Sequence, residues 1–124
     1  MPFLNDPILK PYSDSQWRMV EDFDYVTERG DFIRIPHGFI HDIASIPRPL
    51  NVFFRKHGRH TNAAILHDWC YHTKGAITPK IKLSRLESDR LFLDAMKECG
   101  VGYFKRVSMY YAVRIGGYLS WVND

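Results

Sequence analysis

The strongest structural signal in the chain is SRLESDRLFLDAMKECG, residues 84–100. Ser84 and Glu87 have the spacing of a capping box, in which each side chain binds the other's free backbone N–H at the start of a helix. Gly100 suits the left-handed backbone position that follows a helix end. The stretch therefore predicts a helix between Ser84 and Gly100.

Asp89 lies on the apolar stripe of this predicted helix. Together with Phe92, Leu93 and Met96 it has the i, i+3, i+4, i+7 spacing of one helix face. The three apolar residues are expected in the core, so Asp89 is expected to point inward. A buried carboxylate without a partner is costly, and Asp89 therefore needs a cation, a histidine or backbone N–H donors. The alternative is that Asp89 only favours the positive end of its helix.

Residues 63–73 predict a second helix. Thr61 or Asn62 is its expected N-cap, and Gly75 is its expected stop. The connection to the helix at 84–100 is short, so we expect the two helices to be antiparallel neighbours.

His67 is the candidate partner of Asp89. His67 and Tyr71 share one stripe of the second predicted helix, and Asp68 lies on the adjacent face. A carboxylate that holds one imidazole nitrogen leaves the other nitrogen free to act as a general base on water. The alternative is that His67 is a satisfied core histidine and that the polar group only fixes the packing of the two helices.

The remaining segments complete an α+β fold. Apolar and polar residues alternate over 17–26, and a turn at 28–31 leads to the apolar segment 32–35, which indicates a β-hairpin. Residues 103–119 predict a third helix. We therefore expect an N-terminal β-hairpin and a long ordered loop, residues 36–60, packed on three α-helices.

The helix predicted at 103–119 carries many tyrosines on one stripe. Core packing explains most of that stripe, and surplus tyrosines also suit a protein–protein surface. Arg114 lies on the same stripe. We expect it to stack on an aromatic ring or to reach an acidic partner in the hairpin half of the chain.

Composition indicates one small globular domain. The chain has 124 residues, of which 45% are apolar and 15% aromatic, enough for one core and too few for two domains. We expect an irregular N-terminal arm at 1–16 and a single domain at 17–124. Two cysteines, Cys70 and Cys99, are too few for a disulfide framework and are expected to be small core residues. No apolar run is long enough for a transmembrane segment, and no signal peptide is visible.

Basic residues gather in the middle of the chain. Residues 43–86 hold eight bases and one acid, a net charge of +7. Such a block attracts phosphate groups, although a solvated surface is the simpler interpretation. No nucleic-acid-binding motif accompanies it, so nucleic acid is not an expected partner.

The long loop contains three further candidates. Asp42 and Ser45 are residue types that cap backbone turns, and Arg48 suits a bidentate ion pair with a carboxylate. In the functional alternative the loop completes a pocket at His67, where Ser45 and Arg48 bind the substrate. A Ser45–His67–Asp89 triad also fits the residue types, but Ser45 lacks the flanking glycines of a nucleophile elbow.

Four blocks of sequence occur in an order that is familiar. They are IPHGFIHDIASIPR at 35–48, AILHDWCY at 64–71, SDRLF at 88–92 and YAVRIGG at 111–117. In this order they resemble an uncharacterised phage and prophage family, domain of unknown function 1353. The resemblance spans about residues 20–121 and implies a phage or prophage origin without an established activity.

The segment HDWCY at 67–71, followed by Asp89, is similar to the helix pair of phospholipases A2. This resemblance implies that His67 activates water, that Asp89 orients His67, and that Tyr71 braces Asp89. It also implies that Asp68 binds calcium, a hard cation that polarises an ester carbonyl.

A divalent metal is the expected cofactor, with calcium first and zinc or manganese second. We expect it at Asp68 and Asp42. The wider set of nitrogen and oxygen ligands that the sequence offers comprises His41, Asp42, His67, Asp68, His72 and Asp89.

These observations favour a phage-encoded hydrolase of ester bonds, with His67, Asp89 and Tyr71 at its site. The alternative is a non-enzymatic virion or tail accessory, or a host-interaction protein, in which the same residues form a structural network. The expected partners are phage structural proteins, a host protein or phospholipid. The expected location is the host cytoplasm or the phage virion.

Overall fold

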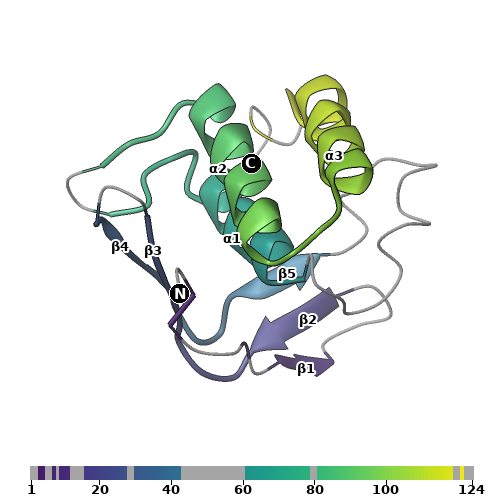
Figure 1. Cartoon of the computed structure of the whole chain (residues 1–124). Coiled ribbons are helices and arrows are strands. Elements are labelled where there is room, and N and C mark those ends of the chain that lie inside the picture. The colour runs from purple at the N-terminus through teal and green to yellow at the C-terminus, as the bar shows by residue number, and fades with distance from the viewer. Residues whose placement is uncertain are drawn as a thin grey trace.

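The computed structural model of the chain describes residues 3–4, 7, 9–11, 16–27, 30–42, 61–78, 81–118 and 121. These residues form five strands and three helices: β1 (Leu9–Pro11), β2 (Gln16–Met19), β3 (Phe23–Val26), β4 (Phe32–Ile35), β5 (Ile40–Asp42), α1 (Thr61–His72), α2 (Arg85–Glu98) and α3 (Tyr103–Gly116). The predicted α+β class is confirmed. In Figure 1 the helices lie above the sheet of β1, β2 and β5, and the β3–β4 hairpin lies beside α1 and α2.

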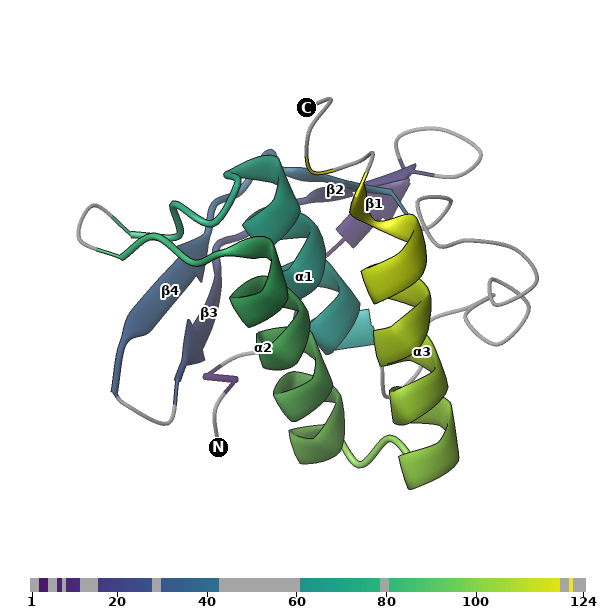
Figure 2. The same cartoon turned by 90° about the horizontal axis from the view of Figure 1, so that it is seen from above.

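The three helices form one layer. In sequence order α1 packs on α2, and α2 packs on α3. Seen from above in Figure 2, α3 lies at the edge of this layer that is far from the β3–β4 hairpin.

The strands form two antiparallel sheets. β3 pairs with β4 in the expected hairpin, and a second sheet has the order β1–β2–β5. The single strand predicted over 17–26 is in fact two strands, β2 and β3, one in each sheet. A bend at Val20 and Glu21 separates them. The apolar residues keep the same phase on both sides of the bend, although Glu21 interrupts the pattern, and this alternation carries no information about the strand with which each half pairs.

Two short strands lie where the sequence indicated irregular structure. β1 lies within the arm 1–16, and β5 lies within the loop 36–60. Both pair with β2, which follows β1 closely in the chain but is separated from β5 by the β3–β4 hairpin. Residues 43–60 lie outside the described residues, so most of the expected loop is not placed.

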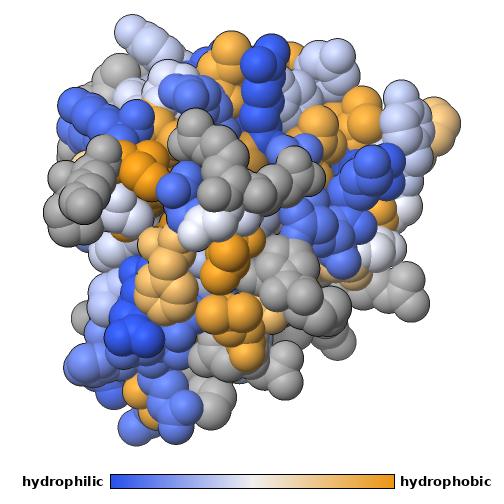
Figure 3. Space-filling view, turned by 60° about the vertical axis from the view of Figure 1, so that its left-hand side comes forward, coloured by the Kyte–Doolittle hydropathy of each residue, from blue (hydrophilic) through white to orange (hydrophobic). Residues whose placement is uncertain are grey.

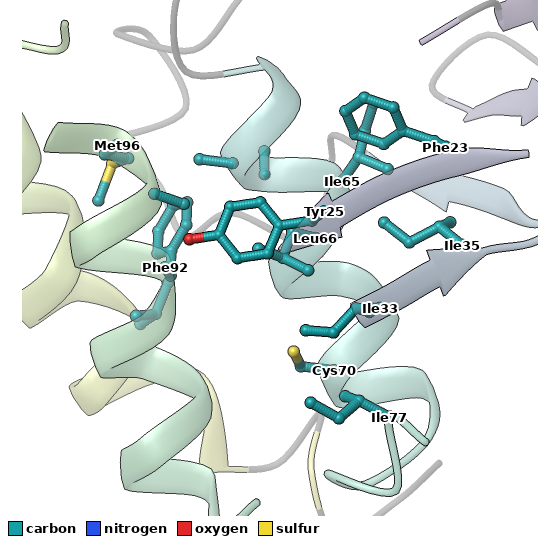
Figure 4. Packing of buried hydrophobic residues seen from close by; sticks show 14 of the residues in the cluster. Phe23, Tyr25, Ile33, Ile35, Ile65, Leu66, Cys70, Ile77, Phe92 and Met96 are labelled. Atoms are coloured by element: carbon teal, nitrogen blue, oxygen red, sulfur yellow. The ribbon is translucent and has the colours of Figure 1, made fainter. Parts of the chain in front are cut away.

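The core lies between the β3–β4 hairpin, α1 and α2. Figure 4 shows Phe23 and Tyr25 of β3 pointing toward the helices, with the Tyr25 ring reaching Phe92 of α2. The alternate residues of β3 and β4 are buried, which explains the period of two in the sequence. Cys70 is buried in this core, as expected, and Cys99 is half-buried.

Local signals at the helix ends hold α1 and α2 in place. Ser84 Oγ accepts a hydrogen bond from the Glu87 backbone at 3.1 Å, and Glu87 Oε1 accepts one from the Ser84 backbone at 3.0 Å, so the predicted capping box is confirmed. Gly75, with a φ of +89°, ends α1 and lies against Leu83, where a Cβ would stand 1.7 Å from the Leu83 carbonyl oxygen. The glycine therefore allows the short connection that places α2 beside α1.

The surface is mixed rather than uniformly polar. On the face displayed in Figure 3, hydrophilic residues cover much of the surface, and apolar residues appear in separate groups between them. Among the described residues, no helix has both the length and the apolar character that crossing a membrane requires.

Candidate functional site

The site is centred on the carboxylate of Asp89, which is 0% exposed on α2. Its Oδ1 accepts hydrogen bonds from His67 Nε2 and from Tyr71 Oη, each at 2.7 Å. Its Oδ2 accepts one from Arg114 Nη1 at 2.8 Å. Arg85 Nη1 lies 3.5 Å from Oδ2. The buried acid therefore accepts hydrogen bonds from α1 and α3 and has an ion-pair partner on its own helix, α2.

This contact confirms the central spatial prediction. Asp89 was expected to point inward because it lies on the apolar stripe of α2, and Phe92 and Met96 on that stripe are buried with it. His67 and Tyr71 are one helical turn apart on α1, so both reach the same carboxylate oxygen.

The hydrogen bond to Asp89 defines the state of the His67 ring. A carboxylate only accepts hydrogen bonds, so the His67 Nε2 atom that faces it must carry a hydrogen. In the neutral ring the lone pair is then on Nδ1. The side chain is 8% exposed and packs between the rings of Tyr71 and Phe92, whose centroids lie 4.4 and 4.5 Å from that of His67.

Arg85 connects Asp89 to the end of α3. Its Nη1 donates to the Val113 carbonyl and its Nη2 to the Arg114 carbonyl, each at 3.1 Å. The last carbonyls of a helix have no partner within the helix and carry partial negative charge, so a guanidinium there satisfies both needs. Arg85 therefore holds α3 in the position from which Arg114 reaches Asp89.

The donors around Asp89 also determine its ionisation. Burial by itself would raise the pKa of Asp89, but the hydrogen bonds from His67 and Tyr71, the charge of His67 and the hydrogen bond from Arg114 lower it below the ordinary value of 3.8. Burial and the hydrogen bond to Asp89 raise the pKa of Tyr71. Asp89 is thus held as an anion and Tyr71 as a neutral donor.

Gly117 lies against Tyr71. A Cβ at this glycine would stand 2.6 Å from the Tyr71 hydroxyl oxygen and 2.4 Å from the Val113 carbonyl oxygen. The ring of Trp121 meets the Tyr71 ring edge-on, with the centroids 5.1 Å apart. The end of α3 therefore covers Tyr71 closely because the chain has no side chain at position 117.

Of the other predicted site residues, the structure describes the side chain of Asp68 alone. Asp68 is half-buried on α1, and it has a partner of its own. The side chains of His41 and Asp42, and the whole of Ser45 and Arg48, lie outside the described residues.

The described side chains contain no group of three or more histidines, cysteines or acids placed to hold a metal ion. His72 is exposed on α1 and stacks on Trp69, with 5.7 Å between the ring centroids. Its ring therefore belongs to an aromatic contact and not to the Asp89 cluster.

Two arginines belong to this site in ways that were not expected from the sequence. Arg114 was expected to pair with an acid of the hairpin half or to stack on a ring, and that expectation was wrong, because its partner is Asp89 of α2. Arg85 was not recognised as part of the site. Its signal was its position four residues before Asp89 on the same helix, the spacing of an i, i+4 ion pair.

Comparison with known proteins identifies the family. Residues 17–113, most of the chain, match the family described as "Protein of unknown function (DUF1353)". Neither a curated protein nor a solved structure matches the chain. The chain belongs to the DUF1353 family, as its four sequence blocks predicted.

Proposed function

We propose that this member of the DUF1353 family is a hydrolase of ester bonds in which His67 is the general base. The observation that carries the proposal is the 2.7 Å contact between His67 Nε2 and the buried Asp89 Oδ1. This contact fixes the tautomer with the lone pair on Nδ1. A lone pair on a ring of fixed orientation is what the abstraction of a proton from water requires.

Asp89 has an orienting role in this proposal. Because its pKa is lowered, it remains an anion and keeps the hydrogen on His67 Nε2. Tyr71 donates to the same oxygen and limits its movement. When His67 takes a proton at Nδ1, the negative charge of Asp89 stabilises the imidazolium that forms, while Arg114 prevents Asp89 from taking the proton itself.

The proposed substrate class is phospholipid, by the local similarity of the His67–Asp68–Tyr71 and Asp89 pattern to phospholipases A2. In this proposal Arg48 binds the phosphate and Ser45 lines the substrate site. A divalent cation, calcium before zinc or manganese, would be held by Asp68 and Asp42 and would polarise the ester carbonyl. The observation that supports Asp68 as a metal ligand is that it directly follows the proposed base, His67, on α1.

The proposed setting is a phage or prophage. The hydrolase would act in the phage virion or in the host cytoplasm, and its partners would be phage structural proteins or a host protein.

A second candidate function is non-enzymatic, as a virion or tail accessory or a host-interaction protein. The observation that favours it is that Asp89 binds partners on all three helices, through hydrogen bonds from α1 and α3 and an ion pair within α2. A fully satisfied buried polar network fixes one helix arrangement, and such a role needs no substrate.

The experiment that tests the proposal compares two histidines of α1. Hydrolysis of a short-chain nitrophenyl ester and of phosphatidylcholine vesicles is measured, with calcium and with a chelator, for the wild type, His67→Gln, His67→Ala and His72→Ala. Removal of a general base is expected to lower turnover by roughly 10²–10⁴-fold. His67→Gln is included because its amide can still donate to Asp89 but has no basic nitrogen. His72→Ala, at an exposed position, is expected to behave as the wild type.

The outcomes separate the two candidates. Loss of turnover in a folded His67→Gln protein supports the hydrolase. Full turnover in either folded His67 variant contradicts it. Absence of any hydrolysis by the wild type, together with a strongly destabilised His67→Ala protein, supports the non-enzymatic candidate.

A further inference from the structure

The outer side of α3 carries large apolar side chains where a surface helix ordinarily carries polar ones. Phe104 is 87% exposed and Ile115 is 83% exposed, and Tyr111 and Tyr118 are each 59% exposed. The spacing of Phe104, Tyr111 and Ile115 places them on one face of α3, and Tyr118 follows directly after the helix end at Gly117. We call these four residues the apolar stripe of α3. The buried residues of α3 lie on its other side: Met109, Ala112 and Val113.

A helix that is apolar on both sides needs cover on the outer side as well. α3 packs on α2 with its inner side. Figure 1 and Figure 2 both show α3 at the edge of the helical layer, away from the β3–β4 hairpin. The apolar stripe therefore faces outward from the fold.

We propose that the apolar stripe of α3 binds the surface of an anionic phospholipid membrane. Charge favours this occupant, because α3 contains no acid and its bases Lys105 and Arg106 remain after Arg114 is paired with Asp89. Two copies of the helix packed stripe to stripe would bring like charges together. Anionic headgroups would instead attract the helix.

The size and composition of the stripe favour the same occupant. A stable protein interface has roughly 20–30 residues on each side, far more than this stripe offers. On a membrane no such area is needed, since each apolar side chain that enters the headgroup boundary contributes separately. Tyr111 and Tyr118 combine an apolar ring with a polar tip, the combination enriched at membrane–water interfaces, and Phe104 and Ile115 supply the deeper anchors.

One end of the stripe adjoins the Asp89 site. The Arg85 guanidinium carbon lies 6.0 Å from the centroid of the Tyr118 ring, and Arg85 also faces Asp89. A membrane bound along α3 would therefore place its headgroups beside that site. The inference rests on the surface of α3 alone and does not depend on hydrolysis by His67.

The test is flotation of the whole protein with lipid vesicles. Vesicles of phosphatidylglycerol and phosphatidylcholine are expected to carry the wild type upward, and pure phosphatidylcholine vesicles are expected to carry much less of it. The double variant Phe104→Ser/Ile115→Ser is expected to lower the partition coefficient by roughly tenfold or more, since two apolar anchors are removed. Lys105→Glu is expected to weaken binding to the anionic vesicles only.

Phe32→Ser is the matched control, because Phe32 is an exposed phenylalanine on β4, outside the stripe. Each variant is first shown to keep the wild-type circular dichroism spectrum, and Lys105→Glu serves alone should the double variant not fold.

The proposal is overturned if the wild type does not float, if the stripe variants bind as the wild type does, or if Phe32→Ser loses as much binding. A wild-type dimer in sedimentation that the double variant abolishes would assign the stripe to a second copy and also overturn it. Flotation does not require turnover, so this proposal and the hydrolase proposal fail separately.

Discussion

Asp89 on α2 and Arg114 on α3 form an ion pair of 2.8 Å in which the carboxylate is fully buried and the guanidinium is partly exposed. The other oxygen of the same carboxylate binds His67 and Tyr71 on α1. One negative charge therefore holds together helices that lie far apart in the sequence. The stability of the fold and the chemistry of the candidate site depend on the same group.

Replacing this charge should be costly. Asp89→Asn keeps the size and shape of the side chain but removes the negative charge that pairs with Arg114 and Arg85. Its amide NH₂ group is a donor, so it also faces one of the donors that now bind the carboxylate. We expect the free energy of unfolding to fall by about 3 kcal/mol, in the range for breaking a buried ion pair. Urea denaturation measures it. The control is Asp24→Asn, which removes one of the two acidic partners of the exposed Arg34 side chain and should cost less than about 1 kcal/mol. Equal losses of unfolding free energy in the two variants would show that the buried ion pair of Asp89 stabilises the fold no more than an exposed one.

The same pair predicts a dependence of stability on pH. The pKa of Asp89 in the native state lies below its ordinary value of 3.8, so between the two values the native carboxyl is ionised while the unfolded one is protonated. Its contribution is therefore complete above the unfolded pKa and is lost as the pH falls toward the native pKa. We expect the free energy of unfolding to drop between about pH 5 and pH 3. Urea denaturation at several pH values should show a smaller drop for Asp89→Asn than for the wild type, and an equal drop would count against the lowered pKa.

Much of the helical half of the fold could be predicted because its signals are local. Ser84 and Glu87 cap α2 through residues three positions apart, and the stripe that includes Phe92 shows which side of α2 is buried. The inward direction of Asp89 followed from that stripe. A buried acid requires a partner, and His67 on the neighbouring helix was the evident one.

The parts that could not be predicted depend on distant pairing. β1 and β5 are short, each belongs to a sheet only through β2, and β5 reaches β2 from beyond the β3–β4 hairpin. Arg114 offered no local signal for its partner, since the direction of an arginine on α3 depends on how α3 docks on α2. That docking involves Arg85 and the carbonyl of Val113, and no spacing rule connects these two residues.

The hydroxyl of Tyr71 should contribute separately from its ring. Tyr71→Phe keeps the packing against His67 but removes one hydrogen bond to Asp89 Oδ1. We expect a loss of about 1–2 kcal/mol in the free energy of unfolding, the usual cost of leaving a buried polar group with one partner fewer. Thermal and urea denaturation measure it. Tyr110→Phe on α3, a half-buried tyrosine outside the Asp89 cluster, should change stability by less than about 0.5 kcal/mol. A neutral Tyr71→Phe substitution would show that Asp89 does not need this donor.

Gly75 and Gly38 separate the cost of a backbone conformation from the cost of a steric contact. Their φ values are +89° and +88°, but a Cβ at Gly75 would stand 1.7 Å from the Leu83 carbonyl oxygen, whereas a Cβ at Gly38 would meet nothing within 4 Å. Gly38→Ala should therefore cost only the left-handed backbone penalty, about 1–2 kcal/mol. Gly75→Ala should cost the same penalty and, in addition, the displacement of Leu83, whose N–H donates to the Gly75 carbonyl at 2.7 Å in the connection from α1 to α2. We expect a total of at least about 3 kcal/mol, since overpacking adds roughly 1–3 kcal/mol.

Urea denaturation of both variants measures the difference, and equal losses would mean that the connection adapts without moving α2. Because His67 lies on α1 and Asp89 on α2, a displaced connection should also weaken their contact, which the NMR signal of the His67 Nε2 hydrogen would report.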